Sequence, residues 1–372
     1  MQNKSLSWLE IDTKIFRENI KLMSSVLSPK TKYMLMVKSN AYGHGLVEIS
    51  KIAVEEGASF LGVSSLKESI ELRSNNIKTP ILLLTEVEAG FIPDIVKYKI
   101  TPTAYNLSYA LALSEITKQK NTIIPIHLKI DTGLNRFGFK VNQALQDVIE
   151  ISQFRNLKIE GIFTHFADAI NDLKSAKEHL SLFNKLCKEV RSYGIYPKYT
   201  HAANSPALVW LKQSHLDLVR FGLAAYGLQP SITKKYPLPI QPIMTWKTKI
   251  MQIKDVKKGE YIGYGKSFKA EKDLTVAVIG IGYADGFRRT PQNFKYVLVK
   301  GTRVSVIGNV TMNFAMVNVS LIKELRLYDE VVIIGSQGNR TITLEEIAKI
   351  TGTINEEIVT SIYALIPRLY IR

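Results

Sequence analysis

The strongest constraint on the fold is a repeated alternation between residues 30 and 225. Short apolar runs rich in β-forming residues alternate there with longer amphipathic stretches, such as residues 66–74 and 175–193. Eight runs can be counted, at 32–38, 59–64, 80–85, 100–104, 123–130, 157–164, 199–202 and 216–220. Strands that alternate with helices favour a parallel sheet, and eight such units predict an α/β fold of the TIM (β/α)8 barrel type.

The sequence changes character after Gly227. Four prolines cluster at Pro230, Pro237, Pro239 and Pro242. Runs rich in β-forming residues follow at 243–253, 274–281, 297–307 and 330–334, with a helical pattern at 344–351. We therefore predict a barrel at 11–235 and a C-terminal, mainly β domain at 236–372, with which residues 1–10 are expected to pair.

Composition excludes several classes of protein. With 372 residues and 46% apolar residues, the chain can bury a large core. No apolar run approaches the ~18 residues of a membrane span, and Met1 to Glu10 lack the apolar core of a secretory signal, so a cytoplasmic protein without membrane contact is expected. The net charge is +16, but its basic residues are dispersed, and no nucleic-acid partner is expected. The single cysteine, Cys187, excludes an internal disulfide and a cysteine-built metal site, and no metal is expected.

Polar residues end several of the predicted strands, where TIM barrels carry their functional groups. Lys38 closes the first run, and burial at a barrel mouth would lower its pKa toward that of a nucleophilic or basic amine. A lysine at this position alone could equally extend to the surface. Arg220 ends the eighth run, where an ordinary buried ion pair is the alternative.

The seventh and eighth runs are followed by residues suited to a phosphate. Asn204 and Ser205 follow the seventh run, and Gly222 and Leu223 follow the eighth. TIM barrels commonly bind phosphate at this position with main-chain amides and small hydroxyls. A helix N-cap at Asn204 or Ser205 is compatible with this interpretation, because a capped helix start favours anions.

The segment Val37-Lys38-Ser39-Asn40-Ala41-Tyr42-Gly43-His44-Gly45 resembles the cofactor-lysine segment of alanine racemases. Further segments resemble motifs of this family in the family's order. They begin at Lys129 (KIDTGLNRFG), Thr164 (THFA), His201 (HAANS), Arg220 (RFGL), Gly263 (GYGKSF) and Gly282 (GYADGFRR). The resemblance covers most of the chain.

This resemblance implies a pyridoxal 5'-phosphate (PLP) enzyme that racemises an amino-acid substrate. Racemisation needs two proton-transferring groups on opposite faces of Cα, since one base would restore the starting configuration. The resemblance assigns these catalytic roles to Lys38 and to Tyr264 of a partner subunit, which implies a homodimer with sites completed in trans. Without the resemblance, a tyrosine in a Gly-Tyr-Gly turn is more typically a loop anchor.

The resemblance also implies roles for other residues. Arg220 would face the pyridine nitrogen and leave it unprotonated, which weakens the cofactor as an electron sink and limits transamination. His165 would stack on the cofactor and connect Arg220 to the tyrosine. The implied cofactor contacts are Lys38, Tyr42, His165, Asn204, Ser205, Arg220, Gly222 and Leu223; the substrate contacts are Arg136 and Met312; the supporting residues are Lys129, often carboxylated in relatives, His201 and Tyr283.

Some positions depart from the family pattern. Asn309 and Asn313 stand where relatives usually carry arginine and aspartate, Glu356 replaces a usual tyrosine, and Leu365 a usual arginine. These changes suggest the hypothesis that substrate preference extends beyond alanine, with serine as first candidate. The alternative is a pocket rebuilt from other residues without a change of specificity.

Two other classes compete with a racemase. A barrel-type PLP decarboxylase normally brings a cysteine from its second domain, whereas Cys187 lies in the barrel half. A non-catalytic PLP-binding protein shares a related lysine and barrel but lacks a second domain with Tyr264. The racemase interpretation implies supply of D-alanine for peptidoglycan.

Overall fold

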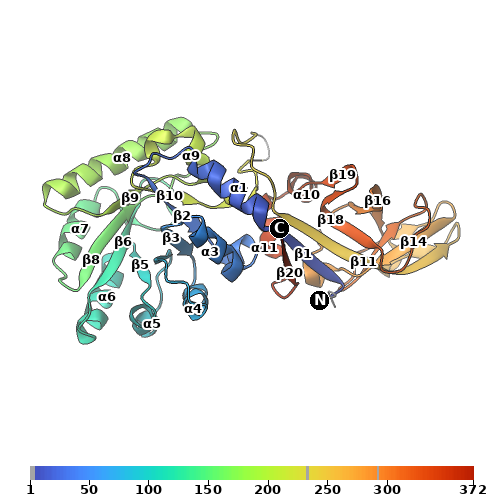
Figure 1. The fold of residues 1–372 in the computed structure, drawn as a ribbon, viewed down its shortest axis with the longest axis horizontal. Coiled ribbons are helices and arrows are strands. Elements are labelled where there is room, and N and C mark those ends of the chain that lie inside the picture. Colours follow the sequence, from blue (N-terminus) through green and yellow to red (C-terminus); the bar gives the residue numbers. More distant parts are fainter. Residues whose placement is uncertain (1–4, 232–233, 291–292) are drawn as a thin grey trace.

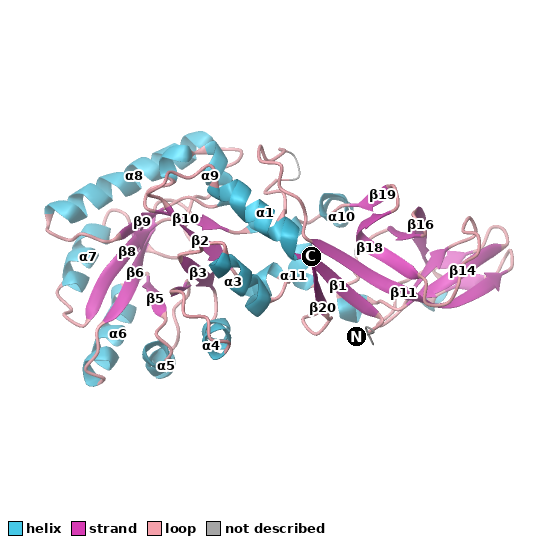
Figure 2. Cartoon of the chain, viewed as in Figure 1, coloured by secondary structure: helices cyan, strands magenta, loops and turns pink. Residues whose placement is uncertain are grey.

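The chain forms two lobes joined side by side. The computed structural model describes residues 5–231, 234–290 and 293–372. Helices surround the strands of one lobe, whereas strands dominate the other (Figures 1 and 2). In the described part of the chain, no helix is both long and apolar enough to cross a membrane.

The first lobe is the predicted parallel barrel. Its strands follow the order β10-β2-β3-β4-β5-β6-β8-β9, and each lies within or overlaps one predicted run. Their bounds are β2 (Lys32–Met36), β3 (Phe60–Val63), β4 (Ile81–Leu83), β5 (Thr101–Ala104), β6 (Ile124–Asp131), β8 (Leu157–Phe163), β9 (Tyr199–His201) and β10 (Leu218–Phe221). The main-chain bond from Asp217 N–H to Thr200 O, 3.1 Å long, helps to bring β9 and β10 together at the seam.

Alternate residues of these strands fill the barrel interior. Met34, Met36, Phe60, Leu82 and Leu218 form one buried cluster. Their neighbours along the strands, such as Leu35 and Leu61, belong to the larger core that includes the helices. Because strands of a barrel are buried on both faces, their sequences read as continuous apolar runs.

Helices cover the barrel from outside, and several begin at a side-chain cap. Asp12, Ser65, Asn106 and Asp172 each accept a main-chain N–H of the first turn. The helices are α1 (Thr13–Ser24), α3 (Leu46–Glu55), α4 (Leu66–Ser74), α5 (Ile92–Lys97), α6 (Leu107–Gln119), α7 (Ala144–Ser152), α8 (Leu173–Ser192) and α9 (Ser205–Trp210). The stretch predicted at 175–193 is thus α8, with Cys187 buried against the core.

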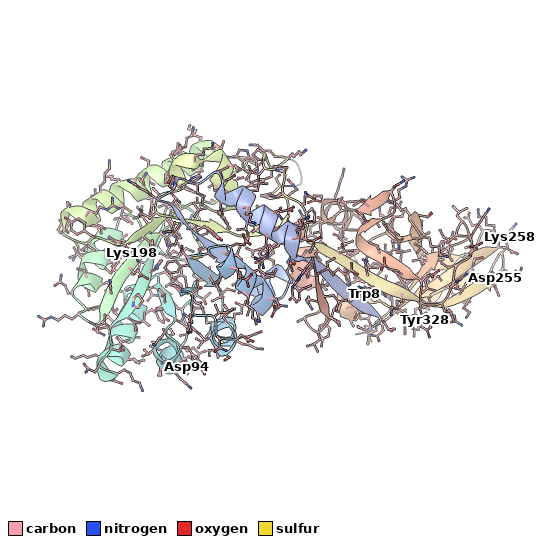
Figure 3. The ribbon with its side chains drawn as sticks, in the orientation of Figure 1. Trp8, Asp94, Lys198, Asp255, Lys258 and Tyr328 are labelled. Atoms are coloured by element: carbon pink, nitrogen blue, oxygen red, sulfur yellow. The ribbon has the colours of Figure 1, made fainter. Side chains whose placement is uncertain are left out.

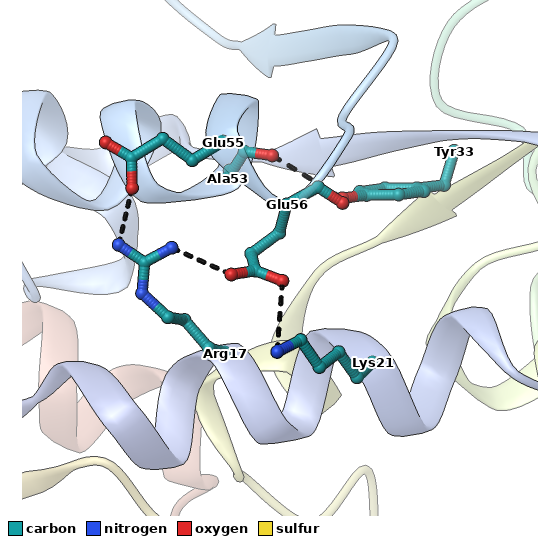
Figure 4. Close-up of polar contacts among 6 residues, drawn as sticks. All are labelled: Arg17, Lys21, Tyr33, Ala53, Glu55 and Glu56. Atoms are coloured by element: carbon teal, nitrogen blue, oxygen red, sulfur yellow. Dashed lines mark hydrogen bonds and ion pairs between the residues drawn. The ribbon is translucent and has the colours of Figure 1, made fainter.

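Ion pairs and hydrogen bonds join α1 to α3 and β2 (Figure 4). Arg17 on α1 contacts Glu55 at 2.5 Å and Glu56 at 2.7 Å. The Tyr33 hydroxyl on β2 donates to the carbonyl oxygen of Glu56 over 2.7 Å. This network fixes the outer helices against the strand that leads to Lys38.

The second lobe is a nine-stranded sheet that includes the N-terminal strand. Its order is β19-β18-β15-β16-β17-β14-β11-β1-β20. The strands are β1 (Ser7–Asp12), β11 (Met244–Val256), β14 (Leu274–Ile279), β15 (Tyr296–Val299), β16 (Thr302–Ile307), β17 (Ala315–Asn318), β18 (Glu330–Gln337), β19 (Arg340–Ile342) and β20 (Arg368–Ile371). β1 pairs antiparallel with β11 and parallel with β20. Figure 3 shows Asp255 and Lys258 at the tip of this lobe farthest from the barrel.

The second lobe differs from the prediction at 297–307. The sequence favours one β-rich run there, but the structure has the hairpin β15–β16, whose turn places Lys300 and Gly301 at positive φ. Glycine adopts this conformation at little cost, so the Lys-Gly pair permits a tight turn inside the run. Two helices, α10 (Leu344–Thr351, as predicted) and α11 (Asn355–Ser361), lie near the junction of the lobes.

Candidate active site

Lys38 begins a left-handed turn at the mouth of the barrel. The four residues from Ser39 to Tyr42 have φ values between 51° and 55°, although none is glycine. This conformation costs about 1–2 kcal/mol per residue, so the surrounding structure must hold it in place. Glu68 accepts the N–H of Asn40 over 3.2 Å, and Asn40 Oδ1 accepts the N–H of Leu46 over 2.8 Å.

A cavity of about 410 Å3 opens beside Lys38. All eight residues expected to contact a cofactor line it, as do Lys129 and Arg136. The other lining residues are Met36, Ser64, Leu84, Thr85, Phe137, Phe163, Pro206, Pro230 and Glu356. The structure thus brings together side chains from the ends of seven strands, β2, β3, β4, β6, β8, β9 and β10. Since Lys38 faces this cavity, it is not the surface lysine of the alternative interpretation.

Arg220 lies at the base of the cavity and is buried. Its Nη1 is 3.0 Å from His201 Nδ1, and its Nη2 is 3.0 Å from His165 Nδ1. Nη2 also donates to the carbonyl oxygens of Thr164 and Ala202 over 2.9 and 2.8 Å. None of these partners is a carboxylate, so Arg220 does not form the ordinary ion pair that the sequence left open.

The cavity is strongly cationic. Burial lowers the pKa of Lys38, and the charge of Arg136 lowers it further. Burial, with Arg136 and Arg220, lowers the pKa of Lys129 to about 8. Burial lowers the pKa of Arg220 to about 9. An anionic ligand would relieve the repulsion among these groups.

The opposite end of the cavity offers small hydrogen-bonding groups. Gly222 N–H donates to Ser205 Oγ over 3.0 Å, and a Cβ added at Gly222 would lie 3.0 Å from the Tyr42 hydroxyl oxygen. Asn204 caps α9 by accepting the N–H of Ala207 over 3.1 Å. The predicted cap is therefore present, and glycine keeps open the space into which Tyr42 points.

The candidate residues of the second lobe lie elsewhere. Tyr264, Tyr283 and Met312 are 73%, 45% and 56% exposed, and among the described residues none of the three lines the cavity. Asn309 Nδ2 donates to the carbonyl oxygen of Tyr264 over 3.1 Å, and Asn309 N–H donates to Ser267 Oγ over 3.0 Å. The asparagine that departs from the family pattern therefore holds the Tyr264 loop, a role that the sequence did not reveal.

Glu356 is the acidic residue among those that line the cavity. Glu356 lies near the start of α11 and is half-buried. Burial raises its pKa, which the charge of Lys38 partly offsets. A carboxylate thus stands at the wall of an otherwise cationic cavity.

His127 is a further buried polar residue that the sequence analysis missed. Its Nδ1 is 3.0 Å from His201 Nε2, behind Arg220. His127 and Lys129 are two residues apart on β6, and residues two apart on a strand point to the same face of the sheet. That spacing places His127 on the same side of β6 as Lys129. The sequence therefore contained a pattern from which the inward position of His127 could be predicted.

Comparisons with known proteins agree over the whole chain. Residues 11–230 match the family "Alanine racemase, N-terminal domain" and residues 243–370 match "Alanine racemase, C-terminal domain". An alanine racemase of Methanococcus maripaludis is 38% identical, with 98% of each chain covered. The solved alanine racemase of Clostridium difficile 630 superposes with a TM-score of 0.95 at 33% identity, covering 100% of this chain and 97% of that one. A histidine racemase of Leuconostoc mesenteroides has a TM-score of 0.91 at 24% identity over 99% of both chains, which shows a shared fold.

Proposed function

This chain belongs to the alanine racemase family, and we propose that it interconverts L- and D-alanine with PLP by a two-base mechanism. The observation that carries the proposal is the position of Lys38, a half-buried amine of lowered pKa that lines the same cationic cavity as Arg136 and Arg220. A neutral amine is the form that can react with a carbonyl compound or accept a proton.

The donor set of the cavity fits PLP. Lys38 would bind the cofactor covalently, Tyr42, Ser205, Gly222 and the start of η3 (Leu223–Tyr226) would hold its phosphate, and Arg220 its ring nitrogen. Asn204 and His165 would complete the contacts. When bound, PLP withdraws electrons from Cα of the substrate and so makes its proton acidic.

The chain's own residues would position the substrate and move protons. Arg136 and the main-chain amide of Met312 would bind the substrate carboxylate, and Lys129 would orient Arg136. Lys38 would exchange a proton at one face of Cα. Tyr264 of the partner subunit would exchange a proton at the other face, with Tyr283 supporting it.

A homodimer follows from this division of roles. Tyr264 is exposed and does not line the cavity of its own chain, so a second copy must present it if it acts. We place the enzyme in the cytoplasm, where its D-alanine would supply peptidoglycan synthesis.

A second candidate is the same reaction with serine-shifted or broadened specificity. Glu356 favours it, because a carboxylate at the cavity wall can accept a hydrogen bond from a substrate hydroxyl, whereas alanine offers none. Of the four departures from the family pattern, Glu356 is the one that lines the cavity among the described residues.

The experiment is chiral chromatography of purified protein with L-alanine and L-serine, together with the visible absorption band of lysine-bound PLP. Formation of the D-amino acid, lost in Lys38→Ala and strongly reduced in Tyr264→Phe, would support the proposal. Lys32→Ala and Tyr261→Phe, at exposed positions nearby, are the matched controls. The absorption band without turnover would favour a non-catalytic PLP-binding protein, and absence of the band would refute the proposal.

A further inference from the structure

We infer that Glu160 is a positioning residue for Arg220 and acts on it through the rings of His127 and His201. The expected effect on catalysis rests on the proposed function, whereas the contacts among these side chains do not. It assigns a role to two residues, Glu160 and His127, that lie outside the cavity.

The four side chains form a row of polar groups inside the barrel, with two hydrogen bonds and one longer contact between a histidine and a carboxylate. Glu160 Oε2 lies 3.8 Å from His127 Nε2. His127 Nδ1 lies 3.0 Å from His201 Nε2, and His201 Nδ1 lies 3.0 Å from Arg220 Nη1. Both histidines are 0% exposed. The four side chains come from β8, β6, β9 and β10, which are neighbouring strands, so the row follows one wall of the barrel.

Arg220 fixes the direction of every hydrogen bond in this chain. A guanidinium only donates, so His201 Nδ1 must accept and the His201 proton must reside on Nε2. His201 Nε2–H then donates to His127 Nδ1, which leaves the His127 proton on Nε2. Burial lowers the pKa of both rings, which keeps them neutral and excludes a second arrangement.

Glu160 is the acceptor toward which this arrangement points. Within the described residues, His127 Nε2 is a buried nitrogen without a hydrogen-bond partner. The Glu160 carboxylate faces it, and a small side-chain movement would shorten 3.8 Å to a hydrogen bond. Interaction with His127 lowers the pKa of Glu160, and Lys198 and Lys158 lower it further, so the group is anionic at neutral pH. Lys198 is labelled on the barrel lobe in Figure 3.

Arg220 needs such a distant counter-charge. Its direct partners are two carbonyl oxygens and two imidazole rings, and the other charged groups that lower nearby pKa values are the cations Lys129, Arg136 and Lys38. A buried charge is costly unless it is paired. The two histidines connect the guanidinium to a carboxylate that cannot approach it directly.

The barrel also fits the His127 ring closely. A Cβ added at Gly161 would lie 2.5 Å from His127 Nδ1 and Cε1. Glycine at this position is therefore required for the ring to occupy its place. Gly161→Ala should therefore displace the His127 ring without replacing Glu160, His201 or Arg220.

The test is solid-state 15N NMR of [15N]histidine-labelled protein, together with kcat and KM of the PLP-loaded enzyme for alanine. The chain has six histidines, which can be assigned by removing them in turn. We expect His127 and His201 of the wild type to carry their protons on Nε2. Glu160→Gln keeps the shape but removes the negative charge. Because Arg220 still sets the tautomers, both protons should stay on Nε2, while the 15N signal of His127 Nε2 should shift. We expect kcat to fall about tenfold, as for loss of a charge-assisted hydrogen bond, with KM nearly unchanged.

Two further variants complete the design. Gly161→Ala, checked for folding by circular dichroism, should shift the 15N signals of His127 and lower kcat. Glu178→Gln, at an exposed position of α8, should change neither. An unchanged His127 Nε2 signal and an unchanged kcat in Glu160→Gln would overturn the inference. So would protons on Nδ1, or charged rings, in the wild type. The NMR result is independent of racemase activity, so a failure of the proposed function would be seen separately.

Discussion

Arg368 donates its Nε–H to the carbonyl oxygen of Gly43 across 3.1 Å. The bond connects β20, in the second lobe, to the residue that ends the left-handed turn after Lys38. Tyr370 adds a second link through its hydroxyl, which donates to the carbonyl oxygen of His44 over 3.2 Å. The geometry around Lys38 thus depends on the second lobe as well as on the barrel.

Replacing Arg368 should therefore destabilise the protein and disturb Lys38. Arg368 also donates to the carbonyl oxygens of Tyr363 and Ala364. Lysine cannot reproduce this fork of donors, so Arg368→Lys should lower the free energy of unfolding by about 2 kcal/mol in urea denaturation. Arg340→Lys, at an exposed position, is the control, and equal stability of the two variants would contradict the prediction.

Mixing two variants of little or no activity should restore activity if sites are completed in trans. A heterodimer of Lys38→Ala and Tyr264→Phe subunits contains one site with both native residues. Random re-pairing after mild denaturation should therefore recover about a quarter of wild-type activity, because half of the dimers carry one good site of two. No recovery, with re-pairing shown by native mass spectrometry, would place Tyr264 in its own subunit's site or outside catalysis.

Lys129 should react with carbon dioxide near neutral pH. Only the neutral amine reacts, and the pKa of Lys129 is lowered to about 8, against 10.5 for an ordinary lysine. The neutral fraction rises as pH rises through about 8, so a 13C carbamate signal at constant dissolved carbon dioxide should grow between about pH 7 and 9. The signal should vanish in Lys129→Ala and persist in Lys140→Ala, which changes an exposed lysine.

Glu356 should control the preference between serine and alanine. Glu356→Tyr, which introduces the residue usual in the family, should lower the ratio of kcat/KM for serine to that for alanine by about tenfold. The reason is that a charged carboxylate acceptor for the hydroxyl is replaced by a weaker, neutral phenol. Glu357→Tyr changes the exposed neighbour and should leave the ratio unaltered. The same ratio in both variants would show that the pocket is built from other residues.

His44 should contribute to acid denaturation. Burial lowers its pKa to about 4, against 6.5 for an ordinary histidine. Between these values the unfolded chain binds a proton that the folded protein does not, so stability falls as pH falls from about 6.5 to 4. This group can account for up to about 3 kcal/mol of the loss. His44→Gln should show a shallower fall in unfolding free energy over this pH window, whereas the exposed substitution Lys51→Gln should follow the wild type.

The sequence predicts the barrel well, because continuous apolar runs and amphipathic stretches have different periods. Lys38 and Arg220 could be identified as candidate site residues because each is a charged residue at the end of an otherwise apolar run. The left-handed turn could not be predicted from the sequence. Ser39, Asn40 and Ala41 have no local preference for positive φ that is strong enough to indicate it. The turn exists because long-range contacts, including those of Arg368, hold it.

Residues that act through others were also invisible in the sequence. Asn309 reads as a departure from a family pattern, yet it binds the main chain of Tyr264. Glu160 reads as a polar residue on a partly solvated strand, and only the folded barrel places it opposite His127. Such roles depend on distances between elements, which local periodicity does not encode.

The place of β1 in the second lobe has a consequence for biosynthesis. The Ser7 hydroxyl donates a hydrogen bond to the carbonyl oxygen of Lys247, 240 residues later, and accepts one from Nε1–H of Trp246. On the ribosome the first strand emerges long before β11 or β20 exists, so it must wait unpaired while the barrel is made. Long-range pairing of this kind slows folding and leaves an edge open to wrong partners. The first strand can therefore complete its pairing only after β20 has been made, and nascent chains are expected to need protection until then.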